Sequence, residues 1–411
     1  MKKVELLAPA SSLEVLKVAV MYGADAVYIG GSAFGLRANA KNFDKEEMQE
    51  AISFAHEHNA KVYVTANIIA HNSDLEGVRE YFRELKAIKP DALIISDIGI
   101  FNIAREIVPE IDIHISTQAN STNYETFKFW YQLGAKRVVS ARELSLAELK
   151  EVKSKNPNNE IEAFAHGSMC ISYSGRCLLS SYFTNRSANL GDCAHPCRWK
   201  YYIMEETRPN EFLPVFENDR GTFIFNSKDL CMIEHIDDMI ESGIDSLKIE
   251  GRMKSALYVA TVISAYRKAI DDYYLNKEEY LHNLEYYKSL IYNCTYRDFT
   301  TGFYYGKADE TTQIYQENTY NKGYTYLGVV ESVENGMARI TQHNKFAVGE
   351  EIEVMQPNNN ETIKTTVKKI INEKEEEVLD APHANEKLLV DVGIPLNVYD
   401  IFKRKEEPNE S

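Results

Sequence analysis

Eight short apolar segments alternate with amphipathic stretches over the first 275 or so residues, and this rhythm constrains the fold more than any other feature. Each segment has six or seven residues and is rich in Val, Ile and Ala, which is typical of strands buried on both faces. The predicted strands are residues 4–9, 25–31, 61–67, 91–97, 112–118, 136–142, 161–167 and 245–251. The stretches between them place apolar residues three and four apart, and several open with Ser, Asn or Asp, as capped helices do.

Eight strand–helix units in succession predict an α/β fold of the (β/α)8 type, a TIM-like barrel. An open, doubly wound sheet is the alternative, because periodicity alone does not show that a sheet closes. The segment after the first predicted strand, APASS, lacks the glycines of the G-x-G-x-x-G fingerprint. A dinucleotide-binding version of the open sheet is therefore weakly supported.

The rhythm predicts how the chain is divided. Residues 1–275 form the barrel, with a long insertion at 168–228 that would emerge at the C-terminal face, where catalytic loops lie. Residues 276–319 are predicted to be a helical and extended linker. Short alternating segments and turn signals predict a smaller all-β barrel domain over 320–405. Residues 406–411 are expected to form a disordered tail.

Composition and charge limit the environment of the chain. Apolar residues make up 44% of the sequence, which excludes disorder as the main state. The N-terminal segment does not resemble a signal peptide, and no run reaches the ~18 apolar residues that span a bilayer. We therefore expect a cytoplasmic protein without membrane contact. The net charge of −16 argues against a generally nucleic-acid-binding surface, but basic segments such as RWK and GRMKS leave room for a local groove.

Four cysteines gather in the insertion: Cys170, Cys177, Cys193 and Cys197, with six, fifteen and three residues between them. Clustered thiols in a reducing compartment indicate metal or redox chemistry, and thiolates suit iron–sulfur clusters or zinc. Only the last pair has the spacing of a zinc ribbon, so a 4Fe-4S cluster is favoured over zinc. Buried thiols acting as small apolar side chains are the alternative.

The two other cysteines are interpreted first as structural. Cys294 carries no signal beyond that. Cys231 lies at the start of a helix predicted near residues 229–241, where it is a candidate substitute ligand.

Polar residues follow or end the predicted strands, and a closed barrel would bring them to one mouth. They are Ser11, Arg37, Asn67, Asp97, Gln118, Arg142, His166, Lys248, Glu250 and Arg252. In KIEGR, alternation places Lys248, Glu250 and Arg252 on one side, which predicts a salt-bridged site. His166 ends the seventh strand and is a candidate for proton transfer. We take His166, Lys248 and Glu250 as candidate catalytic residues, although a structural histidine is the commoner case.

Arginines near thiolates could hold an anionic substrate, although ordinary solvation explains any single one of them as well. The candidate substrate-binding residues are Arg37, Asn67, Gln118, Arg142, Tyr173, Arg176 and Arg252. The sequence contains neither HExxH nor GxSxG, so zincin-type and hydrolase-elbow chemistry are unsupported. A Cys–His protease needs a single activated cysteine, and the clustered thiols fit metal ligation better.

Residues 162–182, EAFAHGSMCISYSGRCLLSSY, resemble the signature of the collagenase-like peptidases, peptidase family U32. Further matching segments are ELLAPA, GADAVYIGG, NRSANLGDCAHPCRW, NSKDL and SLKIEGRMKS. The resemblance covers nearly the whole chain, including the C-terminal β segments, and the paired CxxxC is most similar to the tRNA-hydroxylating members.

The resemblance implies a tRNA-modifying enzyme with a 4Fe-4S cluster held by Cys170, Cys177, Cys193 and Cys197. It implies 5-hydroxylation of the wobble uridine of tRNA, with prephenate as oxygen source. Arg37, Arg142, Arg176 and Arg252 are the candidates for binding the two prephenate carboxylates, and Tyr173 for stacking on a base. Some relatives work in pairs, so a paralogous partner subunit is also implied. A peptidase and a non-catalytic iron–sulfur RNA-binding or partner subunit remain the alternatives.

Overall fold

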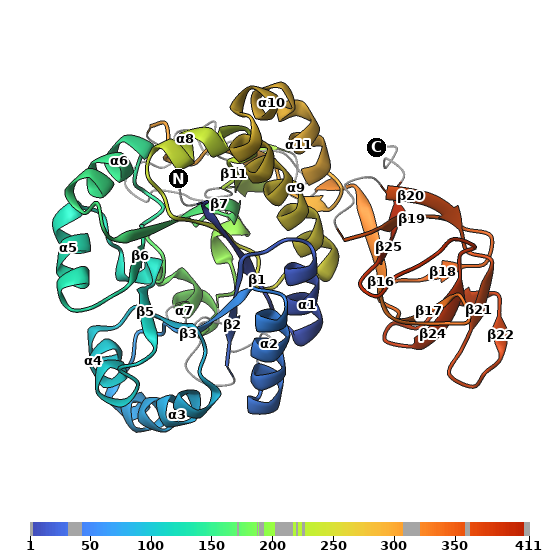
Figure 1. Cartoon of the computed structure of the whole chain (residues 1–411), viewed down its shortest axis with the longest axis horizontal. Helices are drawn as coiled ribbons and strands as arrows, with labels where there is room; N and C mark the ends of the chain where they lie inside the picture. The colour runs from blue at the N-terminus through green and yellow to red at the C-terminus, as the bar shows by residue number, and fades with distance from the viewer. Residues whose placement is uncertain are drawn as a thin grey trace.

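The chain forms a closed parallel β-barrel ringed by helices, with a second, antiparallel sheet at one side (Figure 1). The computed structural model describes residues 3–31, 43–170, 172–186, 188, 193–201, 217–218, 221–223, 227–306, 321–357 and 362–406. The barrel strands are β1 Glu5–Pro9, β2 Ala26–Gly30, β3 Lys61–Ala66, β4 Ala92–Ile95, β5 Asp112–Ile115, β6 Arg137–Val139, β7 Glu160–Ser168 and β12 Ser246–Ile249. They pair in that order and β12 also pairs with β7, so the sheet closes and the predicted TIM-like barrel is confirmed.

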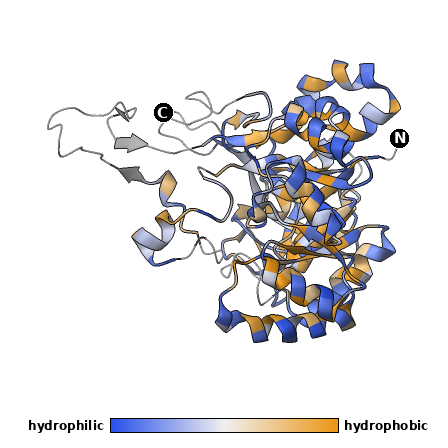
Figure 2. Ribbon diagram, turned by 90° about the vertical axis from the view of Figure 1, so that its left-hand side faces the viewer, coloured by the Kyte–Doolittle hydropathy of each residue, from blue (hydrophilic) through white to orange (hydrophobic). Residues whose placement is uncertain are grey.

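Helices cover the outside of the barrel. They are α1 Leu13–Met21, α2 Lys45–Glu57, α3 Leu75–Ile88, α4 Ile98–Ile107, α5 Tyr124–Gln132, α6 Leu146–Lys155, α8 Ile236–Glu241 and α9 Ala256–Leu275. The starts of α1, α2, α4, α5, α6 and α9 carry side-chain caps, with full capping boxes at Asp44–Glu47 and Ser145–Glu148, whereas α3 and α8 start without a side-chain cap hydrogen bond. The strands are buried on both faces, and Figure 2 shows hydrophobic residues gathered on the strands and the helix sides that face them.

A charged network, here called the floor, fills the barrel near the amino-terminal ends of its strands. Arg137 begins β6, and its guanidinium donates to Glu5 (2.5 Å), Glu160 (2.8 Å) and Glu162 (3.0 Å). Lys248 Nζ donates to the other Glu162 oxygen at 2.8 Å. Glu162 is fully buried, so these two cations compensate a carboxylate that has no access to water.

The region after β7 differs in part from the prediction. Residues 229–231 form strand β11, antiparallel to β7, rather than the start of a helix. A third strand, β14 Phe299–Thr300, pairs parallel to β11. The predicted helix is therefore wrong at its start, because the β7 edge offers this segment a hydrogen-bonding partner; α8 begins only at Ile236 after a 3-10 turn at 233–235.

Two short helices, a short strand pair and an eight-stranded sheet follow α9. They are α10 Lys277–His282, α11 Leu284–Ile291, and β13 Thr295–Tyr296 paired with β15 Asn321–Lys322. The antiparallel sheet runs β20 Thr362–Thr366, β19 Glu351–Met355, β25 Ile401–Lys405, β16 Tyr324–Glu334, β17 Met337–Thr341, β24 Lys387–Asp391, β21 Lys369–Ile371 and β22 Glu377–Val378. Strands β18 Phe346–Ala347 and β23 Asp380–Ala381 form a further pair. The sheet curves as a half-barrel around its own apolar core, which agrees with the predicted small all-β unit.

The half-barrel packs directly on the first helices of the barrel. Tyr22 Oη donates to the Met355 carbonyl at 2.9 Å, and Tyr326 Oη donates to Glu14 at 3.2 Å. Of the predicted tail, Glu406 is paired with Lys322, whereas 407–411 lie outside the described residues. Among the helices of the described ranges, none combines the length and apolarity needed to cross a membrane.

Candidate functional site

Polar side chains tie together the carboxyl-terminal ends of three adjacent strands, β3, β4 and β5. Ser96 Oγ donates to the Asn67 carbonyl at 2.9 Å, and Asn67 Nδ2 donates to Ser116 Oγ at 3.2 Å. Ser116 caps the 3-10 turn at 117–119, which carries Gln118. The turn starts where the predicted strand 112–118 was expected to continue, and it directs the Gln118 side chain into the barrel mouth.

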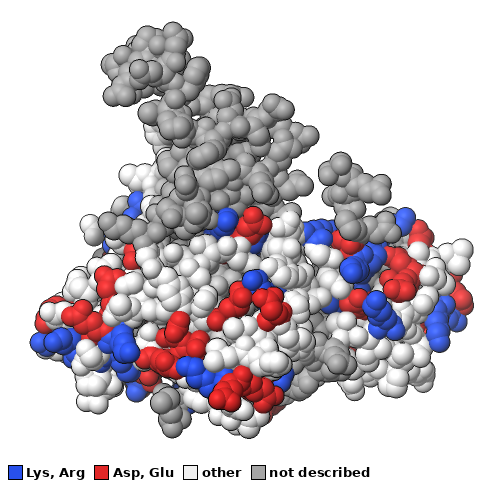
Figure 3. All heavy atoms as spheres, turned by 90° about the horizontal axis from the view of Figure 1, so that it is seen from above, with Lys and Arg blue, Asp and Glu red and all other residues white. Residues whose placement is uncertain are grey.

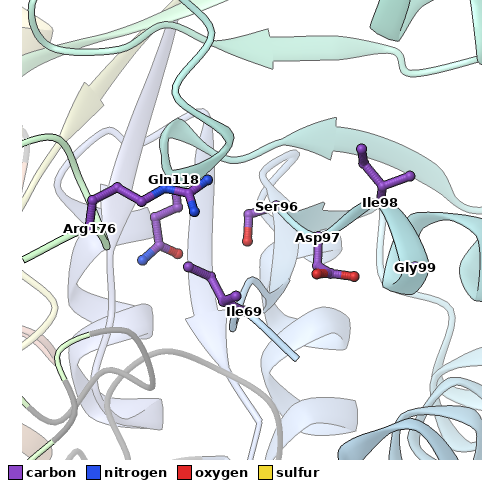
Figure 4. Close-up of a pocket in the computed structure, with 7 residues that line it drawn as sticks. All are labelled: Ile69, Ser96, Asp97, Ile98, Gly99, Gln118 and Arg176. Carbon is purple, nitrogen blue, oxygen red and sulfur yellow. The ribbon is translucent and has the colours of Figure 1, made fainter. Parts of the chain in front are cut away.

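A pocket of about 210 Å³ opens beside these strand ends (Figure 4). It is lined by Ile69, Ser96, Asp97, Ile98, Gly99, Gln118 and Arg176. Arg176 comes from the cysteine-bearing insertion and lies alongside Gln118, with Ser96 and Asp97 across the pocket. The insertion therefore forms one wall of a pocket whose other walls belong to the barrel.

Gln118 is the most informative residue of this pocket. Its side chain is only 6% exposed, and its Oε1 has no hydrogen-bond partner among the described residues. Gly175 presses against the other end of the amide: a Cβ added there would lie 2.6 Å from Gln118 Nε2, and its φ is +72°. The glycine lets the insertion approach the amide, while the unpartnered oxygen leaves an acceptor for a ligand.

A second polar pair, Arg142 with Glu250, lies at the ends of β6 and β12. The two side chains approach to 3.6 Å, and the Arg142 guanidinium also donates to the Ser168 carbonyl and lies 4.0 Å from the Phe164 ring. Arg142 Nε is buried without a hydrogen-bond partner in the described part of the chain. Arg142 thus combines a partly compensated charge with an unused donor.

The predicted cluster of Lys248, Glu250 and Arg252 does not form, and this part of the prediction is wrong. Lys248 is in the floor, where it binds Glu162, with its ammonium 4.5 Å from the Tyr28 ring. Strand β12 ends at Ile249, so the strand alternation assumed for KIEGR does not extend to Glu250 and Arg252. Arg252 instead reaches Thr65 Oγ1 at 3.1 Å and is 4% exposed.

His166 is enclosed rather than open to the mouth. It is 2% exposed, and the rings of Tyr258, Tyr266 and Phe299 surround it at centroid distances of 5.5–6.1 Å. Burial, assisted by the charge of Lys254, lowers the pKa of His166 to about 3. The imidazole is therefore neutral over the physiological range, as expected of a structural histidine.

The four insertion cysteines lie beyond the end of β7. Cys170 is exposed, and Cys177 precedes helix α7 Leu179–Thr184. Cys193 and Cys197 flank a turn at His195, whose backbone N–H donates to Cys193 Sγ at 3.3 Å, and the 3-10 turn 196–198 contacts α7. Ala194 N also donates to Ser180 Oγ at 2.9 Å, so the two cysteine pairs are on segments that contact each other.

The donor chemistry of these thiols fits an iron–sulfur cluster. Four soft sulfur donors and a backbone N–H directed at one of them are features of iron–sulfur sites. The described residues contain no grouping of three or more Cys, His, Asp or Glu side chains arranged to hold a metal ion.

The structure thus sorts the predicted residues into three groups. Gln118 and Arg176 line the pocket, and Asn67 is hydrogen-bonded to Ser96 and Ser116 next to it. Arg142 meets Glu250 at the ends of β6 and β12. Tyr173 is 47% exposed in the turn that leads to Arg176, here called the rim, and Arg37 lies outside the described residues. Lys248 and His166 are buried away from the pocket.

Ser96 was not predicted as a site residue, and Asp97 was not among the predicted substrate-binding residues. Both directly follow the apolar run of β4, and Asp97 accepts a hydrogen bond from Ile100 N at 3.0 Å as the cap of α4. Their position, between a buried strand and the start of a helix, was the sequence signal that could have identified both as site residues.

Two protein-family models match the chain. The model of peptidase family U32 matches residues 11–314, and the model of the U32 C-terminal domain matches residues 322–403. The chain, a TIM-like barrel with a cysteine-bearing loop and this C-terminal unit, therefore belongs to peptidase family U32.

Curated relatives narrow the comparison further. The chain is 44% identical over 358 residues to tRNA hydroxylation protein P1 of Bacillus subtilis, covering 87% of this chain and 84% of the relative. It is 38% identical to tRNA hydroxylation protein P of Escherichia coli, covering 93% and 92%. It is also 36% identical to the 23S rRNA 5-hydroxycytidine C2501 synthase of Escherichia coli, over 66% of this chain and 39% of that protein.

Proposed function

We propose that this chain hydroxylates tRNA, at carbon 5 of the wobble uridine. The observation that carries the proposal is the match, along 87% and 93% of the chain, to relatives named for tRNA hydroxylation. The pocket at the barrel mouth supports it, because a base-sized space there is lined by an amide acceptor and a guanidinium.

The pocket chemistry suits uracil. The base presents an N3–H donor between two carbonyl oxygens. Gln118 Oε1 would accept from N3–H, and the Arg176 guanidinium would donate to an adjacent carbonyl. A wobble base is in a single-stranded loop, so it can enter the pocket without breaking a base pair. Tyr173 at the rim could stack on a neighbouring base.

Prephenate is the proposed oxygen source. Its two carboxylates call for guanidinium donors, and Arg142, after the carboxyl-terminal end of β6, has a buried Nε–H with no partner among the described residues. The step breaks the C5–H bond of uracil and the C–OH bond of prephenate and forms the C5–OH bond. When the rest of prephenate leaves as carbon dioxide and an aromatic keto acid, two electrons and two protons are released, counted for the free acids, so the reaction needs a two-electron acceptor in addition to the oxygen source.

Cys170, Cys177, Cys193 and Cys197 are the proposed ligands of a 4Fe-4S cluster, with zinc as the alternative. When bound, such a cluster supplies one-electron transfer. The role of this chain's own residues is separate: Gln118 and Arg176 orient the base, and the insertion that carries the thiols closes one side of the pocket.

The family name raises peptidase activity as an alternative, and the one Cys–His neighbourhood described in the barrel does not favour it. Cys231 pairs with His166 across β7 and β11. Burial raises the pKa of the Cys231 thiol to about 11 and lowers that of His166 to about 3. Both groups are therefore neutral, whereas a cysteine nucleophile needs a thiolate.

The experiment is nucleoside analysis of tRNA from a strain lacking this gene and its paralogues, complemented with defined variants. The wild-type chain should restore 5-hydroxyuridine, and Arg176→Ala should lower it at least about tenfold by removing the guanidinium of the pocket. Arg186→Ala, an exposed arginine of the same insertion, is the matched control and should restore it fully. Unchanged 5-hydroxyuridine in the uncomplemented strain would remove the proposal.

A further inference from the structure

A second cavity lies between the barrel and the half-barrel, near the start of α9. Its volume is about 320 Å³, within the range of sites that hold small organic ligands. The barrel contributes Lys254 and Ser255, and the half-barrel side contributes Lys322, Tyr324, Tyr326 and Asn344. Lys254 and Ser255 belong to the basic segment GRMKS, and none of these residues lines the proposed catalytic pocket.

Lysines give the cavity a cationic lining. Two of its lining residues are lysines, and among the described residues no carboxylate lines it. Two carboxylates contact lining residues from outside the cavity. Glu406 pairs with Lys322 at 3.3 Å and Glu14 accepts from Tyr326 at 3.2 Å, so one of them partly offsets the charge. The remaining excess of positive charge favours an anion.

Aromatic rings line the wall of the cavity. The rings of Tyr326 and His343 stack at a centroid distance of 4.5 Å with an interplanar angle of 26°. The Tyr324 ring lies 3.9 Å from the ammonium of Lys403, a fully buried lysine. Asn344 Nδ2 donates to the Tyr326 carbonyl at 2.7 Å and its side chain is exposed at the edge. Lysines and flat rings in the same lining match a phosphate attached to a base.

One loop connects this cavity to the barrel mouth. Glu250 and Arg252 contact barrel-mouth residues, Arg142 and Thr65, while Lys254 and Ser255 in the same loop line the cavity. A strand of RNA whose target base enters the mouth pocket could therefore continue across this loop. Figure 3 shows acidic and basic side chains interspersed on one face, so binding of RNA by this acidic chain needs local sites of this kind.

We propose that the cavity between the barrel and the half-barrel binds a nucleotide of the RNA substrate outside the modified one, with its phosphate at Lys254 and Lys322 and its base against the aromatic wall. This inference rests on the proposed function for the identity of the RNA. It gives the C-terminal half-barrel a role in holding RNA, independent of the chemistry at the mouth.

The test is equilibrium binding of a full-length, unmodified tRNA transcript to the whole chain at several KCl concentrations. Lys254→Gln with Lys322→Gln should weaken binding about tenfold at low salt and reduce the salt slope by about 1 to 2. Lys364→Gln with Lys374→Gln removes two exposed lysines of the same half-barrel and is the matched control, with unchanged affinity and slope. Thermal unfolding of each variant checks that the fold is retained.

The outcomes separate this inference from the proposed function. Weaker binding in the cavity variant alone supports it, whether or not the wild-type chain hydroxylates the RNA. Equal affinity and slope in the two double variants would overturn it even if hydroxylation is intact. Binding of uridine monophosphate without binding of tRNA, or no RNA binding by the wild-type chain, would also overturn it. Should the double variant unfold, Asn344→Ala at the exposed edge provides the second measurement, with a smaller loss of affinity expected.

Discussion

The two ends of the barrel treat polar groups in opposite ways. At the floor, Arg137 is paired with three carboxylates and Lys248 with Glu162, all within 3.0 Å. At the mouth, Gln118 Oε1 and Arg142 Nε are buried with no hydrogen-bond partner in the described part of the chain. Unsatisfied buried groups cost stability, and such atoms are also present elsewhere in the described chain, His114 Nδ1 inside the barrel among them. We assign the floor to the stability of the fold and propose that the two groups at the mouth bind a ligand.

The largest effect should come from breaking the floor. Arg137→Met would leave Glu162 buried with only Lys248 and should lower the free energy of unfolding by about 3–5 kcal/mol. Urea denaturation measures this. Arg79→Met removes a half-exposed arginine that pairs with Glu106 and should change stability by less than about 1 kcal/mol. Similar losses for the two variants would contradict the role given to the floor.

At the mouth, the same kind of substitution should affect activity rather than folding. Gln118→Ala removes the unpartnered acceptor and should lower the rate of tRNA hydroxylation at limiting tRNA by about 10- to 100-fold. Its unfolding free energy should stay within about 1 kcal/mol of wild type, because no hydrogen bond to Oε1 is lost. Gln132→Ala, at the exposed end of α5, is the control. A Gln118→Ala chain that is fully active would remove this residue from base recognition.

The pH dependence of the unfolding free energy tests whether His166 is structural, as the floor residues are, or catalytic. The pKa of His166 is about 3 in the folded chain against 6.5 as its ordinary value, because burial opposes the charged form. Between these values the unfolded chain binds the proton and the folded chain does not, so stability falls as the pH drops below about 6.5. In His166→Asn the slope of unfolding free energy against pH should be smaller by up to about 1.4 kcal/mol per pH unit in this window.

The exposed His282 provides the comparison for that slope. His282→Asn should follow the wild-type pH dependence. If His166→Asn also follows it, the imidazole is accessible and charged in the folded chain, and a proton-transfer role would regain support.

The smallest effect on stability is expected at the rim. Tyr173 is 47% exposed, and Tyr173→Ala should change the unfolding free energy by less than about 0.5 kcal/mol. Loss of one stacking partner should weaken tRNA binding by a few-fold or more. Tyr286→Ala, on the exposed side of α11, should leave binding unchanged. Equal affinities for the two variants would place the RNA elsewhere.

The barrel was predictable because a short apolar run in the sequence marks each strand. All eight predicted strands are present, since short apolar runs bounded by helix caps fix both the element and its order. The extra strand at 229–231 was not predictable, because its conformation depends on pairing with the end of β7 at 166–168 rather than on its own sequence. Long-range pairing overrides local propensity there.

The site was predictable as a set of strand ends but not as a geometry. Asn67, Gln118 and Arg176 were expected at the mouth, where Gln118 and Arg176 line one pocket and Asn67 is hydrogen-bonded next to it. Lys248 was misplaced because it faces the barrel interior nearer the amino-terminal ends of the strands, where Glu162 binds it, rather than at the mouth. The pairing of Arg142 with Glu250 joins residues 108 positions apart, which spacing alone does not reveal.

The most direct measurement is anaerobic reconstitution of the purified chain with iron and sulfide, followed by reaction with an unmodified tRNA transcript, prephenate and an electron acceptor. We predict that 5-hydroxyuridine forms at the wobble position with the wild-type chain and the Arg186→Ala control, and falls at least about tenfold with Arg176→Ala. A chain that carries iron and sulfide, binds tRNA and leaves every uridine unmodified would contradict the account.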